Sequence, residues 1–152
     1  MNRIRLAIIG AGAIGRKHIE VIQQTPEAEL VALADPSPQA QALATSLGIA
    51  WYADINDMLD QVNPQGVINA TPNTLHVPCA IACVERGIPV LVEKPVAESP
   101  ERAQALVDAA AQHGVPVLVG HHRRHNALTA AAKSLIDSGE LGNIVAVSAH
   151  WI

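Results

Sequence analysis

Aromatic residues are nearly absent from this chain of 152 residues, in which they make up 2% and Phe does not occur. A core without large rings must be built from Val, Ile, Leu and Ala, which are typical of strands buried on both faces of a parallel sheet. Charged residues reach only 16% against 49% hydrophobic residues, which excludes disorder as the main state. The length is that of one domain, long enough to bury a sizeable core.

Other absences exclude classes of partner. No apolar run reaches the roughly 18 residues of a membrane span, so we expect no membrane partner. The basic residues are scattered in a chain of net charge −4, which predicts no nucleic-acid partner. The apolar run near the N-terminus is too short for a signal peptide, and Arg16 and Lys17 follow it at once. Cys79 and Cys83 lie on a predicted helix and indicate reduced thiols in a cytoplasmic protein.

The apolar pattern alternates between the periods of strands and helices along the whole chain. Strands are predicted at 4–10, 28–35, 49–53, 66–71, 88–93, 115–120 and 143–152, and helices at 13–25, 38–47, 54–61, 74–86, 99–113 and 126–138. Such alternation with short connections is typical of an α/β fold with a parallel sheet and right-handed crossovers. Two successive three-strand halves predict a Rossmann doubly wound sheet of order 3-2-1-4-5-6, which binds ligands beyond the carboxyl ends of its strands.

A glycine motif lies between the first predicted strand and the first helix. Gly10, Gly12 and Gly15 have the GxGxxG spacing, with Ala13 and Ile14 between the last two. The first glycine permits a tight turn, the second lets a pyrophosphate approach the backbone, and the third allows close packing of helix on strand. The free N–H groups and the dipole of the helix then face the phosphates. The motif predicts a dinucleotide site, and the alternative is a glycine-rich turn without function.

Asp35 ends the second predicted strand, twenty residues after Gly15. A carboxylate at this place can accept both ribose hydroxyls of an adenosine and repels a 2′-phosphate. No Lys or Arg occurs between Lys17 and Arg86, so the loop after Asp35 offers no cation to a phosphate. We therefore predict NAD as the cofactor, with NADP less favoured. The alternative is that Asp35 caps the helix that begins near Pro38.

Glu93 and Lys94 stand at the carboxyl end of the predicted strand 88–93, within the motif EKP. A lysine beside a carbinol can hold its oxygen and stabilise alkoxide charge, and it can also move a proton. Glu93 can orient the lysine or bind the ribose on the nicotinamide side. Lys94 is therefore the candidate catalytic residue, and the alternative is a surface ion pair.

Two more polar segments follow strands of the predicted sheet. In the first, Thr71 and Pro72 are followed by Asn73, a plausible N-cap, and by His76, which either packs or contacts the ligand. In the second, His121 and His125 are spaced like metal ligands on a helix.

No carboxylate or thiol lies near these two histidines in the sequence, so no metal is predicted there. A cationic lining of the active-site mouth is the preferred interpretation. In it, His121 or His122 faces the ligand, and Arg123 or Arg124 anchors the loop or a polar substrate.

Together, these segments resemble the N-terminal half of the Gfo/Idh/MocA oxidoreductases, the glucose–fructose oxidoreductase and inositol 2-dehydrogenase family. The resemblance is carried, in chain order, by GAGAIGRKH, ADPSP, ATPNTLH, GIPVLVEKP and GHHRRHN. Many dehydrogenases share the glycine motif, whereas EKP preceded by TPNxxH is much more specific.

The resemblance implies a nicotinamide-dependent oxidation of a sugar, cyclitol or related polyol. By position, it assigns the cofactor to Gly10, Gly12, Ala13, Ile14, Gly15, Asp35, Thr71, Pro72, Asn73, His76, Glu93 and Lys94. Glu93 and Lys94 would border the nicotinamide and the substrate, and Arg124 matches the arginine usual after the sixth strand of the family. His122 and Arg123, from the cationic lining, complete the predicted substrate side. Ala127 stands where family members often have Pro, so the turn there departs from the family pattern.

Members of this family continue into a second α/β domain that binds the substrate and carries an Asp and a His of the proton relay. The resemblance therefore implies a dinucleotide-binding domain at 1–142 and, at 143–152, the opening strand of a truncated substrate domain. We expect this chain alone to be inactive on polyols. A non-catalytic, redox-sensing or regulatory dinucleotide-binding module is the main alternative. Another dehydrogenase class on the same fold is a third, and EKP argues against both.

The segment 143–152 alternates apolar and polar residues, the period of a strand with one buried face. A strand without neighbours leaves N–H and C=O groups unpaired along both edges. We expect it to pair with the same strand of a second copy and to form a homodimer. The alternative is a monomer in which this segment is disordered.

Overall fold

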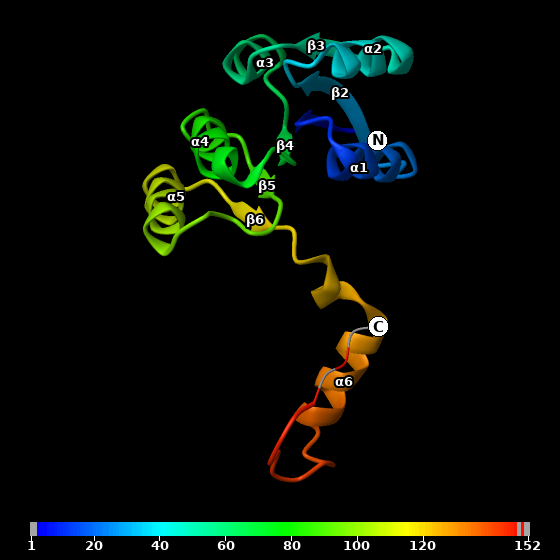
Figure 1. The fold of residues 1–152 in the computed structure, drawn as a ribbon, viewed down its shortest axis with the longest axis vertical. Helices are drawn as coiled ribbons and strands as arrows, with labels where there is room; N and C mark the ends of the chain where they lie inside the picture. The colour runs from blue at the N-terminus through cyan, green and yellow to red at the C-terminus, as the bar shows by residue number, and fades with distance from the viewer. Residues whose placement is uncertain (1–2, 149, 151–152) are drawn as a thin grey trace. The chain divides into compact units, whose positions relative to one another are not determined.

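The computed structural model describes residues 3–148 and 150 and divides the chain after Gly120 into two compact units (Figure 1). The first unit alternates strands and helices: β1 (Ile4–Ile9), α1 (Ala13–Gln23), β2 (Ala28–Ala34), α2 (Pro38–Leu47), β3 (Ala50–Tyr52), α3 (Ile55–Val62), β4 (Gly66–Asn69), α4 (Asn73–Val84), β5 (Val90–Val92), α5 (Pro100–His113) and β6 (Val117–Val119). The second unit holds the 3₁₀ helix η1 (His122–His125) and the helix α6 (Ala127–Asp137).

The six strands of the first unit form one sheet in the order β3-β2-β1-β4-β5-β6, and every neighbouring pair is parallel. This order confirms the predicted doubly wound sheet. Because β1 is flanked by β2 and β4, the chain reverses its direction of travel across the sheet between β3 and β4. The loops at this reversal meet at the carboxyl edge, where open α/β sheets bind their ligands.

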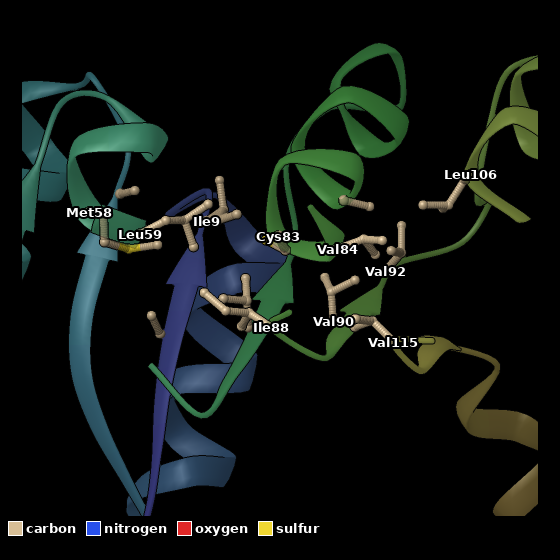
Figure 2. Packing of buried hydrophobic residues seen from close by; sticks show 14 of the residues in the cluster. Ile9, Met58, Leu59, Cys83, Val84, Ile88, Val90, Val92, Leu106 and Val115 are labelled. Carbon is tan, nitrogen blue, oxygen red and sulfur yellow. The ribbon is translucent and has the colours of Figure 1, made fainter. Parts of the chain in front are cut away.

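Helices cover both faces of the sheet over its central strands, as the apolar strands predicted, whereas Leu118 and Val119 of the edge strand β6 are 64% and 40% exposed. Along β1, Ala7 and Ile9 join one core cluster with side chains of α3, α4 and α5, whereas Ile8 joins a second cluster with α1 and α2. Figure 2 shows the first cluster, in which Met58 and Leu59 approach the sheet beside Ile9. Burying an aliphatic side chain completely stabilises the fold by about 1.5–3 kcal/mol, so aliphatic side chains can hold this sheet together without any Phe.

Helix starts follow the sequence signals where these are strong. Ser99 caps α5 by accepting a hydrogen bond from the N–H of Arg102, and Pro100 is its first residue, as predicted. Ser37 caps α2 in the same way, with Pro38 next to it. Asp35 is therefore not the capping residue of α2, and the alternative role considered for it is wrong.

The two cysteines are free, with Cys79 half-buried and Cys83 buried. Burial raises the pKa of the Cys83 thiol to about 12, so this thiol remains protonated. The described part of the chain contains no helix with the length and apolarity that a membrane crossing requires.

The predicted strand at 143–152 is not formed in the described residues of this segment, 143–148 and 150. Ala149, Trp151 and Ile152 lie outside the described residues. Val145 is 95% exposed and Val147 81% exposed. The physical reason is that a strand needs a neighbour for its N–H and C=O groups, and the described residues of this one chain provide none at that place.

Candidate functional site

Two glycines of the motif are fixed by the protein's own backbone. Gly10 has φ +91°, and a Cβ added there would lie 2.7 Å from the carbonyl oxygen of Ala70, which follows β4. A Cβ on Gly15 would lie 1.9 Å from the carbonyl oxygen of Gly10. Both positions exclude any side chain, because the turn after β1 is pressed between α1 and the loop after β4.

Gly12 differs from the other two glycines, since an added Cβ would meet no atom within 4 Å. Gly12 is the N-cap of α1, which has no side-chain cap and no acidic residue in its first turn. Ala13 and Ile14 are exposed in that turn, so the free N–H groups of the helix start face open space. The protein does not require glycine at this position, whereas an anion placed against the helix start would require it.

Asp35 lies beside the glycine turn with both carboxylate oxygens engaged. Its Oδ2 accepts from the N–H of Ala11 at 2.8 Å, and its Oδ1 accepts from the N–H of Ser37 at 2.9 Å. Burial raises the pKa of Asp35, but hydrogen bonds from Ala11 and Ser37 and the charge of Arg16 outweigh it and lower the pKa below its usual value. The carboxylate is therefore ionised and held in place, and each oxygen retains a lone pair for a further hydroxyl.

Arg16 is a residue of this site that the sequence analysis missed. Its Nε donates to the carbonyl oxygen of Ala11 at 3.1 Å, and its charge acts on Asp35. The loop after Asp35 contains no cation, and the positive charge that acts on Asp35 comes from the first turns of α1 instead. The signal was available, because a βαβ unit brings the start of its helix next to the end of its second strand.

A pocket of about 420 Å³ opens between the ends of β1 and β2 and the loop after β4. Its lining is mostly apolar apart from two carboxylates: Ile9, Gly10, Ala34, Asp35, Pro36, Ala53, Asp54, Ile55, Thr71, Pro72, Leu75 and Cys79. The size falls within the range of about 300–1,000 Å³ that small-molecule sites occupy. An apolar pocket with a fixed carboxylate at its rim suits a flat ring carrying a sugar with hydroxyl groups.

The loop after β4 is held by the buried Asn69. The Oδ1 of Asn69 accepts from the hydroxyl of Thr71 at 2.7 Å, and its Nδ2 donates to the carbonyl oxygen of His76 at 2.9 Å. Pro72 is exposed, and it is the N-cap of α4 in place of Asn73. The predicted capping role of Asn73 is wrong, because its polar side chain lies within the helix at its first residue and is exposed.

His76 is 1% exposed, and both of its ring nitrogens lie next to carbonyl oxygens. Nδ1 is 2.7 Å from the oxygen of Pro95, and Nε2 is 2.8 Å from the oxygen of Thr71. Of the two interpretations left open by the sequence, the structure favours packing over a contact with the ligand.

Glu93 and Lys94 directly follow β5 at the same edge of the sheet. The N–H of Glu93 donates to the carbonyl oxygen of Asn69 at 3.0 Å, which fixes the turn against the end of β4. Lys94 is exposed, and its side chain forms no ion pair within the part of the chain that the structure describes. The alternative of a surface ion pair is therefore wrong, and the ammonium group is available to a ligand.

The Glu93 carboxylate is only 14% exposed and pairs with His18 of α1, whose Nε2 lies 2.8 Å from its Oε1. A Cβ on Gly120 would lie 3.0 Å from this carboxylate, so the glycine leaves room for it. His18 was not among the predicted site residues. The sequence nevertheless marks His18 as unusual, because it is a polar residue on the face of α1 that otherwise packs on the sheet through Gly15, Ile19 and Ile22.

The predicted substrate-side residues belong to the second unit. His122, Arg123 and Arg124 are exposed in η1. A cavity of about 360 Å³ in this unit is lined by His122, Arg123, His125, Asn126 and Thr129. Their role toward a substrate stays a prediction. Among the described residues, no three His, Cys, Asp or Glu side chains gather as metal ligands would.

Known proteins resemble this chain over nearly its whole length. A family model described as "Oxidoreductase family, NAD-binding Rossmann fold" matches residues 4–121. Rhizopine catabolism protein MocA of Rhizobium meliloti is 32% identical over 97% of this chain and 47% of its own length. The scyllo-inositol 2-dehydrogenase (NAD(+)) of Bacillus subtilis is 34% identical over 93% of this chain and 42% of its own length.

Among solved structures, the WlbA dehydrogenase from Bordetella pertussis in complex with NADH and UDP-GlcNAcA matches 94% of this chain and 44% of that chain. The TM-score is 0.89 and the sequence identity 35%. The chain spans less than half the length of these relatives.

Proposed function

Because the chain belongs to the Gfo/Idh/MocA family of oxidoreductases, whose NAD-binding Rossmann domain it matches, we propose that it is the cofactor-binding part of a dehydrogenase. The enzyme would move a hydride between NAD and a CH–OH carbon of a sugar, cyclitol or related polyol. The observation that carries this proposal is Lys94, whose exposed ammonium group has no ion-pair partner among the described residues and lies at the sheet edge that also holds the glycine turn.

The residues at this edge suit each part of a dinucleotide. The open space at Gly12 and the uncapped start of α1 would receive the pyrophosphate. The Asp35 carboxylate would accept the hydroxyls of the adenosine ribose, and the apolar pocket beside it would take the adenine. Thr71 and Pro72, on the other wall of that pocket, would border the cofactor as well.

NAD supplies the hydride acceptor when it is bound, and the chain's own residues handle the substrate oxygen and its proton. Lys94 would donate a hydrogen bond to the carbinol oxygen and stabilise the negative charge that develops there. It would also pass on the proton when the oxygen loses it. Glu93, which pairs with His18, would hold the turn that contains Lys94 at the end of β5.

The second candidate is a regulatory module that binds NAD and converts nothing. A lysine at the end of β5 that is exposed and forms no ion pair with any described residue favours the enzyme, because a sensor does not need it. The test is NADH formation with scyllo-inositol and other polyols, in a protein that joins this domain to a substrate domain. NAD binding with no turnover of any polyol by the joined protein would favour the module.

Asp35→Asn should reduce the preference for NAD over NADP on the order of tenfold. One unit charge at about 4 Å in water contributes about 1 kcal/mol, and a 2′-phosphate carries more than one charge. Arg16 lies close enough to act on Asp35 and would then be free to attract that phosphate. Calorimetric titration of both cofactors measures the ratio of their dissociation constants.

Asp54→Asn is the matched control, since Asp54 lines the same pocket but faces the start of α3, which it caps. This variant should keep the wild-type ratio. Equal affinity of the wild type for both cofactors, or an unchanged ratio in Asp35→Asn, would show that Asp35 does not select the cofactor.

We also propose that residues 143–152 belong to a substrate domain that follows residues 1–142, and that the protein works in the cytoplasm as a homo-oligomer. In this chain the exposed Val145 and Val147 would favour pairing with a second copy. The intact chain should therefore scatter light as a dimer, and a chain ending at Gly142 should scatter as a monomer. If both the intact chain and the shortened chain are monomeric at high concentration, the segment does not pair.

A further inference from the structure

We propose that His18 and His76 are positioning residues for Lys94, which they hold from two different helices through the residues on either side of it. His18 of α1 pairs with Glu93, and His76 of α4 contacts Pro95. Lys94 stands between these two anchored neighbours with its own side chain exposed. The inference rests on the proposed role of Lys94 in the reaction.

On the Glu93 side, the carboxylate is enclosed by three elements. His18 lies 2.8 Å from Oε1, the N–H of Lys94 donates to Oε2 at 3.2 Å, and Gly120 packs against the group. The carboxylate therefore connects α1 directly to the backbone of Lys94. A carboxylate with this little exposure holds its conformation only while its charge is matched by hydrogen bonds, and the imidazole is the only side chain in the described residues that pairs with it.

On the Pro95 side, His76 lies between two backbone carbonyl groups. Its Nδ1 is 2.7 Å from the oxygen of Pro95 and its Nε2 is 2.8 Å from the oxygen of Thr71, and both oxygens can only accept. The imidazole therefore fills the space between the loop after β4 and the loop after β5, and a hydrogen on Nδ1 is what the bond to Pro95 requires.

This connection reaches the cofactor turn. The backbone of Ala70 and Thr71 lies 2.7–2.9 Å from where a Cβ on Gly10 would be, so the loop that His76 holds is pressed against the glycine motif. A continuous chain of contacts runs from Gly10 through Thr71 and His76 to Pro95. The turn that contains Lys94 is thereby fixed relative to the glycine turn that would hold the pyrophosphate. His76 achieves this from a buried position, without touching the cofactor.

The wild-type chain can be tested without any activity. Nitrogen NMR of the imidazole rings should show a hydrogen on Nδ1 of His76, the nitrogen next to the oxygen of Pro95, with and without NAD. A bare Nδ1 would show that His76 does not donate to the loop after β5 and would overturn the bridge. Hydrogen exchange at the Lys94 amide should become at least roughly tenfold faster in His18→Ala, the effect of losing a hydrogen bond to a charged group.

Amide substitutions separate the two contacts of each ring, because Asn places its N–H₂ near Nδ1 and Gln places it near Nε2. His18→Gln should therefore restore slow exchange at Lys94 relative to His18→Ala. His76→Asn, which keeps the donor to Pro95, should disturb Lys94 less than His76→Gln, which keeps the donor to Thr71. The reverse order would overturn the assignment. His113→Gln, at the exposed end of α5, is the matched control and should change nothing.

In a protein that joins this domain to a substrate domain, His18→Ala and His76→Gln should lower kcat about 10- to 100-fold, since a misplacement of roughly 1 Å can cost on the order of 10²-fold. The dissociation constant of NAD should stay within about threefold, which separates positioning from loss of the fold. Wild-type kcat in both variants would overturn the inference. If instead Lys94 proves unimportant for the rate, the proposed function fails, while the NMR and exchange data still decide whether the two histidines hold its loop.

Discussion

Gly15→Ala should lower the free energy of unfolding by about 3 kcal/mol, the upper part of the range for overpacked sites. The new methyl group would lie 1.9 Å from the carbonyl oxygen of Gly10, a distance that only a shift of the backbone can relieve. Since α1 packs on the sheet at this point, the shift would separate Ile19 and Ile22 from their core cluster. Thermal unfolding followed by circular dichroism should show a fall in Tm on the order of 10 °C.

Gly12→Ala is the matched variant, with the same change three residues earlier. No atom lies within 4 Å of the added Cβ, so its Tm should equal that of the wild type. Its affinity for NAD should nevertheless fall on the order of 10²-fold, because two hydrogen bonds to a charged phosphate contribute about 1.5–3 kcal/mol each. Loss of stability in Gly12→Ala, or wild-type NAD affinity, would show that the open space at Gly12 is not the phosphate site.

The strand order and the position of the glycine turn could be predicted from the sequence because the signals are local. A strand of Ile and Ala residues followed by Gly10 and a helix is one supersecondary unit, and six such strands with short connections allow few topologies. The cap at Ser99 was predicted for the same reason, since a serine before a proline at a helix start satisfies nearby N–H groups. The same pattern stands at Ser37 and Pro38, where the cap considered was Asp35 instead.

The connections between distant segments could not be read in this way. Arg16 lies near Asp35, and His18 pairs with Glu93, because the sheet brings the start of α1 between the ends of β2 and β5. Neither Arg16 nor His18 is a sequence neighbour of the carboxylate on which it acts. The strand expected at 143–152 failed for a related reason, since its periodicity is local but its hydrogen-bond partners are not.

The structure also changes what Asn73 and His76 mean. Both belong to the TPNTLH segment, in which a capping role was predicted for Asn73 and His76 was left open between packing and contact with the ligand. The exposed Asn73 does not cap α4, whereas the buried His76 has both ring nitrogens next to carbonyl oxygens. Exposure therefore overturns the capping role predicted for Asn73 and favours packing for His76. Periodicity alone could not do this, because both residues lie in the first turn of one helix.

Lys94→Ala should have the largest effect on the reaction and little effect on cofactor binding. Acid–base groups typically contribute 10²–10⁴-fold to the rate, so kcat of a protein joining this domain to a substrate domain should fall by about that factor. The dissociation constant of NAD should stay within about threefold, because the glycine turn, Asp35 and the adjoining pocket do not depend on the ammonium group. Stopped-flow measurement of NADH formation gives kcat, and calorimetry gives the dissociation constant.

Lys17→Ala is the control for the loss of one positive charge near the same sheet edge. Lys17 is exposed on α1 and pairs with Glu20 at 2.7 Å, so removing it should leave kcat unchanged. Lys94→Arg should remain far below wild type, since arginine keeps the charge but does not release a proton at neutral pH. A rate within about threefold of wild type in Lys94→Ala, well under the usual range for acid–base groups, would assign the lysine a structural role and remove the main support for a dehydrogenase.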